Sequence, residues 1–162
     1  MSRFDLTTVT GLSGFLAMQS SALIALKPLA EDARCNELVL SLIGLAECDL
    51  EVLDTQPVHM TPEWSKPPDM MAIDYVILGS RIGTQVLRKR WARSDAPLVK
   101  AASAYFSAPS FIALWHQFCR VAEQSPAQGQ NADQVVKDAK HLFEFYASCA
   151  NAALSETETV NA

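Results

Sequence analysis

The stretch that decides the fold is Leu78–Leu87, with the sequence LGSRIGTQVL. It lies inside residues 69–93, where apolar residues recur at helical spacing and predict one long helix. A glycine inside a helix costs roughly 1 kcal/mol relative to alanine, so the two glycines of this stretch require a reason. Gly79 and Gly83 lie one turn apart on one face. Either a second helix approaches them closely, or they leave room for a flat ligand.

The same helical spacing recurs on both sides of this stretch. It predicts helices over about residues 8–31, 32–53, 98–106, 110–124 and 131–154. Residues 56–68 contain four prolines, whose fixed φ and missing N–H exclude a regular element, so we expect a crossing loop. No strand alternation or internal repeat is found. The sequence therefore predicts a single all-α domain over residues 1–154 and a polar, disordered tail over residues 155–162.

Composition and charge restrict the function classes. The 162 residues carry a formal net charge of -5, which argues against a broad nucleic-acid interface. One local exception is a basic run near the end of the long helix, formed by Arg88, Lys89, Arg90 and Arg93. Such a run complements the helix dipole or contacts a protein or phosphate. The acidic residues Glu47, Asp49, Glu51 and Asp54 are predicted to form a solvated face.

The remaining composition favours a cytoplasmic protein. The four cysteines are widely spaced without a C-x-x-C pair, which is typical of reduced thiols and not of a metal site. We expect no leader, and no window of the roughly 18 apolar residues that a membrane span needs. Glycine-rich phosphate loops, nucleophile elbows and H-E-x-x-H helices are absent from the sequence. No enzyme class is indicated by these motifs.

The LGSRIGTQVL stretch resembles the distal helix of the heme oxygenases, whose pattern is similar to L-G-x-x-x-G-G-Q-V-L. Residues 111–118 resemble the next helix of that family, and residues 135–143 resemble its last helix. The resemblance covers roughly Gly11 to Ala153. It implies a heme oxygenase-like multi-helical bundle of the bacterial type, with heme as cofactor and biliverdin as product.

Departures from the family pattern argue against that activity. The family's proximal histidine lies on an N-terminal helix, whereas this chain has no histidine before His59. Ser80 stands where animal enzymes carry an aspartate, and Thr84 stands in place of a second glycine, towards the heme space. The propionate partners fall at Ile112 and His116. We therefore expect no cofactor, and only a vestigial heme cleft formed by Gly79, Ser80, Gly83, Thr84 and His116.

The leading hypothesis is a noncatalytic heme oxygenase-like protein that contacts another protein as a regulatory module in bacterial signalling. Its expected interaction residues are Arg88, Lys89, Arg90 and Arg93, with Trp64 in the proline-rich loop beside several methionines. Two alternatives stay open: a heme oxygenase with a non-standard ligand such as His59 or His116, and a carrier of heme or bilin. A homodimer is also expected, because loss of the family's first helix exposes apolar surface.

Overall fold

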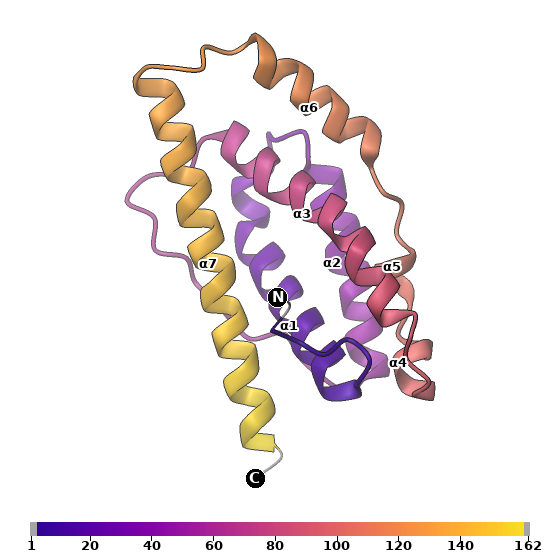
Figure 1. The fold of residues 1–162 in the computed structure, drawn as a ribbon. Coiled ribbons are helices and arrows are strands. Elements are labelled where there is room, and N and C mark those ends of the chain that lie inside the picture. Colours follow the sequence, from indigo (N-terminus) through magenta and orange to yellow (C-terminus); the bar gives the residue numbers. More distant parts are fainter. Residues whose placement is uncertain (1–2, 161–162) are drawn as a thin grey trace.

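The computed structural model describes the backbone of residues 3–160 and the side chains of residues 3–156. The helices are α1 (Val9–Leu26), α2 (Asn36–Val52), α3 (Met70–Trp91), α4 (Pro97–Ala101), α5 (Ala104–Ser107), α6 (Ile112–Gln124) and α7 (Gln130–Val160), with a 3-10 turn η1 at Lys27–Leu29. No strand occurs in the described residues, so the all-α class is confirmed. Figure 1 shows the long helices packed side by side, with α6 at the top of the view, outside them.

Helix boundaries differ from the sequence prediction at four places, one of which is the start of α2, at Asn36 instead of residue 32. The first helix ends at Leu26 because Pro28 cannot continue it, and the chain turns through η1 instead. The short helix predicted over 98–106 is divided into α4 and α5 at Ala102, whose ψ of 77° is not helical. Helix α7 continues to Val160, beyond the predicted start of the tail at Ser155, and residues 161–162 lie outside the described residues.

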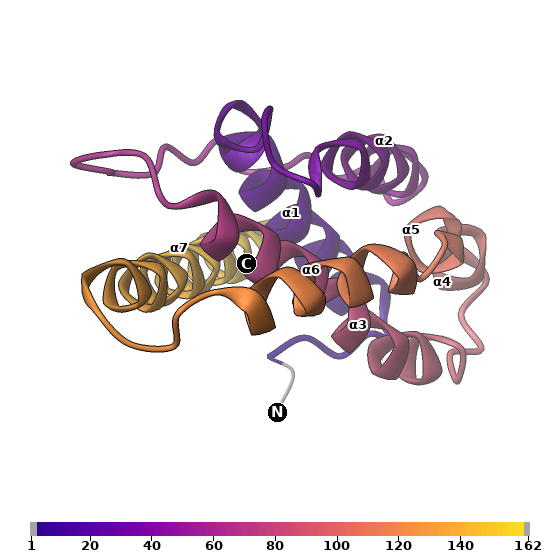
Figure 2. The same ribbon diagram turned by 90° about the horizontal axis from the view of Figure 1, so that it is seen from above.

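The core is organised around α1, which packs against α2 on one side and α7 on another. Viewed from above, α1 lies between these helices (Figure 2). Most of its residues are buried, because its apolar and small side chains are distributed around the helix. The stretch Val9–Leu29 is also long and apolar enough to cross a membrane, with mean hydropathy 1.5, although we expected no such window. Since 67% of it is buried inside the protein, it also has the character of a core helix.

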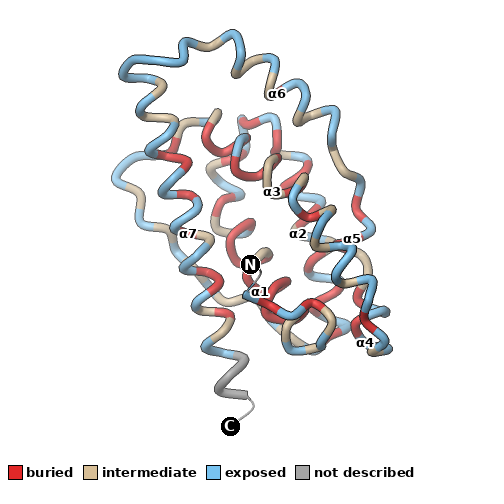
Figure 3. The backbone as a smooth tube through the Cα atoms, viewed as in Figure 1, coloured by how far each residue is buried: buried red, intermediate tan, exposed pale blue. Residues whose placement is uncertain are grey.

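Helix α6 packs only loosely. Helical spacing predicts an inward stripe formed by Phe111, Leu114, Trp115, Phe118 and Val121, but Phe118 is the only described residue of the helix that is buried. On α7, helical spacing predicts that Val136 and Phe143 face inward, but this prediction is wrong, because Val136 is 55% exposed and Phe143 is 51% exposed. The rings of Trp115 and Phe118 stack at 5.4 Å and lie 6.3 and 6.2 Å from Tyr75. Along α6, exposed residues alternate with partly buried ones (Figure 3), because only one face of this helix contacts the rest of the protein.

The N-terminal segment folds back onto α1. Phe4 and Leu6 are buried, and the ring of Phe4 meets that of Phe15 edge-on at 6.4 Å. Gly11 makes this possible, because a Cβ there would overlap the carbonyl oxygen of Asp5. The hydroxyl of Ser94 donates to the Thr7 carbonyl at 2.6 Å and ties the segment to the residues after α3. The N-terminal segment thus covers part of the apolar surface of α1 within one chain.

Candidate functional site

The two glycines of α3 have different surroundings. A Cβ built on Gly79 would lie 3.5 Å from the indole of Trp115, which α6 places against this position. A Cβ on Gly83 would meet nothing within 4 Å, and Gly83 is exposed. A Cβ on Gly79 would thus be in ordinary van der Waals contact with α6, and no described neighbour requires a glycine at position 79 or at position 83.

Ser80 and Thr84 make hydrogen bonds within their own helix. The Ser80 hydroxyl donates to the carbonyl of Ile77 at 2.8 Å, and the Thr84 hydroxyl donates to the carbonyl of Ser80 at 2.9 Å. Thr84 is buried, at 4% exposure. The helix turns the Thr84 side chain into the core, whereas the neighbouring Gly83 is exposed.

Arg81, which no sequence motif marks, is the best-anchored side chain of the LGSRIGTQVL stretch. It is only 1% exposed, and its guanidinium donates to the carbonyls of Tyr105 at 3.3 Å, Ala108 at 2.5 Å and Pro109 at 3.2 Å. It also lies 5.6 Å from the centre of the Tyr105 ring. Burial lowers the pKa of Arg81, and the carbonyls at the end of α5 compensate its charge. Arg81 therefore fixes the connection between α5 and α6 against α3.

Asp49 has a comparable structural role and does not belong to a solvated face. It is 2% exposed, and its carboxylate accepts the backbone N–H groups of Ala104 at 2.9 Å and Tyr105 at 2.8 Å. Burial raises the pKa of Asp49, while these two hydrogen bonds act in the opposite direction. Glu47 and Glu51 are exposed as predicted. The buried carboxylate thus holds the start of α5 on α2.

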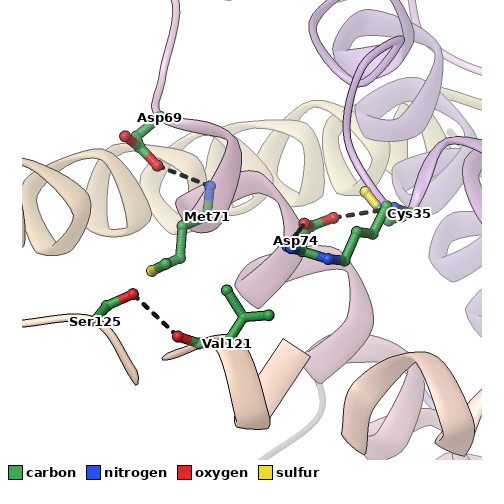
Figure 4. Close-up of polar contacts among 7 residues, drawn as sticks. Cys35, Asp69, Met71, Asp74, Val121 and Ser125 are labelled. Carbon is green, nitrogen blue, oxygen red and sulfur yellow. Dashed lines mark hydrogen bonds and ion pairs between the residues drawn. The ribbon is translucent and has the colours of Figure 1, made fainter. Parts of the chain in front are cut away.

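Two further buried aspartates also hold helix starts. The Asp74 carboxylate accepts the backbone N–H of Cys35 at 3.0 Å and lies 3.4 Å from the Arg34 guanidinium (Figure 4). The Asp138 carboxylate accepts the backbone N–H of Asp69 at 2.9 Å. Cys35 and Asp69 are the capping residues of α2 and α3. These carboxylates satisfy helix-terminal N–H groups, which lack partners within a helix.

The histidines do not assemble a heme site of the family type. His59, His116 and His141 are exposed and belong to the proline-rich loop, α6 and α7. No group of three histidine, cysteine, aspartate or glutamate side chains suited to a metal is found in the described residues. Heme needs an axial ligand and open space over both distal glycines; Gly83 is open, but the Trp115 ring lies against the Gly79 position and the three histidines are exposed on separate elements. The residues present therefore do not fit heme in the manner that the resemblance implies.

The basic run lies at one end of α3. Arg88, Lys89 and Arg90 occupy the last turn of the helix, Arg93 follows it, and all four are exposed. Cations at this end complement the helix dipole. None of the four takes part in an ion pair that joins described residues, whereas the exposed Lys100 lies 3.4 Å from Asp95. This run, which we call the basic surface, is exposed to solvent.

Trp64 does not join the basic surface. It is partly buried, and its ring lies 6.0 Å from that of Phe145 in α7. Its indole Nε1 is buried without a hydrogen-bond partner in the described residues. The tryptophan thus anchors the proline-rich loop on α7, and the exposed apolar residue near the end of this loop is Met70, at 53%.

Together these features define an all-α protein whose buried charged groups support helix ends and a loop. The comparisons with known proteins give no relative: no family model matches the chain, and neither a curated protein nor a solved structure matches it.

Proposed function

We propose that this chain is a noncatalytic protein of the heme oxygenase-like fold that binds another protein as a regulatory module in bacterial signalling. The contacts of the buried ionisable groups support the proposal that the protein is noncatalytic. Arg81, Asp49 and Asp74 are all engaged with backbone groups that the fold needs satisfied. Groups held in this way lack the freedom to bind substrate, whereas a catalytic acid or base must reach a reacting atom.

The observation that carries the binding function is the basic surface. The chain has 13 lysine and arginine residues against 18 aspartate and glutamate residues, yet Arg88, Lys89, Arg90 and Arg93 are gathered at one end of α3 without a described ion pair. Val86 and Leu98 flank this region in sequence and are 60% and 51% exposed. An acidic segment of a partner protein complements such a surface, and opposite charges speed association and select the partner.

The test is affinity capture from cells of the source organism, followed by titration of the purified candidate partner. We compare the wild-type chain with the double variant Arg88→Glu and Arg93→Glu. The matched control is Lys137→Glu with Lys140→Glu, which changes the net charge equally at exposed positions of α7. We expect the first variant to weaken binding about tenfold or more, because like charges face each other, and we expect added salt to weaken wild-type binding.

A partner that binds both double variants equally would contradict the docking surface. A separate experiment tests whether the protein is noncatalytic. Titration with hemin, followed by a reductant, distinguishes a heme oxygenase from a carrier of heme or bilin. Binding followed by biliverdin formation would establish an enzyme, and binding without turnover would establish a carrier of heme or bilin. We expect neither outcome, because Trp115 lies against the Gly79 position and the three histidines are exposed on separate elements.

A further inference from the structure

A hollow of about 380 Å³ lies between α1, α3, α7 and the N-terminal segment. Its floor is apolar. Phe15 and Met18 of α1 contribute to it, with Leu87 of α3 and Ala150 of α7, and Phe4 closes one side. All but Leu87 are less than 9% exposed, so these side chains are fixed by the core beneath them.

The polar groups around this hollow are hydrogen-bond donors. Arg3 and Arg90 line it from the N-terminal segment and from α3, and Gln19 lines it from α1. The Arg3 guanidinium donates to Asn151 Oδ1 at 2.6 Å, which places it on the side of α7. The Tyr105 hydroxyl donates to Gln19 Oε1 at 3.3 Å, so the oxygen of this amide is occupied and its NH2 group is the one left to donate. No carboxylate is among the lining residues.

We propose that this hollow binds a small amphipathic anion, an organic carboxylate with a short acyl chain or a small aromatic body. The apolar floor receives the body, while Arg90, Arg3 and the Gln19 amide meet the carboxylate. The volume is at the small end of ligand pockets, so it suits a short chain or a fused ring pair and not a tetrapyrrole. In a chain of net charge -5, two guanidinium groups beside apolar side chains give the site its preference for anions.

The inference does not depend on the proposed protein-binding function. Arg90 is the one residue that the hollow shares with the basic surface, and the floor residues belong to the hollow alone. The fluorescent probe for the test is anilinonaphthalene sulfonate, an aromatic anion, titrated into the full chain. We expect saturable fluorescence, and displacement of the probe by octanoate. Octanol and octylammonium carry the same chain without a negative charge, so we expect them to compete at least about tenfold more weakly.

Three variants locate the binding. Gln19→Glu keeps an acceptor oxygen for the Tyr105 hydroxyl and replaces the NH2 donor by carboxylate oxygen, so octanoate affinity should fall about tenfold or more. Arg90→Gln should lower the affinity about fivefold, because its guanidinium is exposed and partly screened. Arg93→Gln is the matched control, since Arg93 belongs to the same basic run but does not line the hollow. Circular dichroism melting checks that each variant is folded.

The proposal is overturned if the probe shows no saturable binding, if octanol displaces it as well as octanoate does, or if Arg90→Gln and Arg93→Gln behave alike. A failure here is distinguishable from a failure of protein binding. Gln19→Glu leaves Arg88, Lys89 and Arg93 in place, so partner binding should persist in this variant while octanoate binding is lost.

Discussion

Replacing Arg81 with methionine is expected to lower the free energy of unfolding by about 2–4 kcal/mol. The substitution removes three hydrogen bonds from a charged donor and leaves the carbonyls of Tyr105, Ala108 and Pro109 without that partner. Each such bond is worth about 1.5–3 kcal/mol, but removing the guanidinium also removes the cost of burying its charge, so the net loss is smaller than the sum. Methionine fills most of the same volume and limits the cavity.

Urea unfolding followed by circular dichroism measures this loss. We expect the midpoint to fall while the slope stays unchanged, since a change in slope would indicate an altered denatured state. Arg93→Met is the control, because an exposed substitution away from packed features stays within about 0.5 kcal/mol. A loss below about 1 kcal/mol for Arg81→Met would refute the inference that this residue fixes the connection between α5 and α6.

Three further predictions concern the glycines and the cysteines. Gly83→Ala should stabilise the protein by about 0.5–1 kcal/mol in thermal unfolding, because open space surrounds the new Cβ and alanine favours the helix; a loss of stability would indicate a constraint that the structure lacks. Gly11→Ala should detach the N-terminal segment and increase its proteolysis, and an unchanged cleavage rate would contradict the packing on Asp5. At pH 8 a thiol reagent should leave Cys35 and Cys149 unmodified until denaturant is added, because burial raises the pKa of both thiols, that of Cys149 to about 11; rapid native reaction at either would be inconsistent with their burial.

Helical periodicity was sufficient to predict the all-α class, because the apolar spacing of α1, α2 and α3 is long and regular. It did not predict which faces acquire a neighbour. Val136 and Phe143 have the spacing of inward residues on α7, yet both are exposed, because periodicity identifies an apolar face and not the element that covers it. Pro28 gave a visible signal for the end of α1. The break at Ala102 had none, since its non-helical ψ depends on the tertiary contacts of α5.

The buried charges could have been found in part from the sequence. Arg81 lies four residues after Ile77 and three before Thr84, so a charged residue stands on the buried stripe of α3. Asp49 likewise follows Ala46 by three residues on the buried face of α2. Such spacing indicates that the charged side chain is buried and needs hydrogen-bond partners in the interior. The identity of the partners could not be predicted, because Ala108 and Pro109 approach Arg81 only in the folded chain.

An absorbance titration of the purified protein with hemin tests the central claim most directly. We expect a featureless titration, with no Soret shift that saturates at one equivalent, because Trp115 lies against the Gly79 position and the three histidines are exposed on separate elements. A saturating shift that responds to reductant and oxygen and yields biliverdin would contradict it, and would assign the chain an enzymatic function.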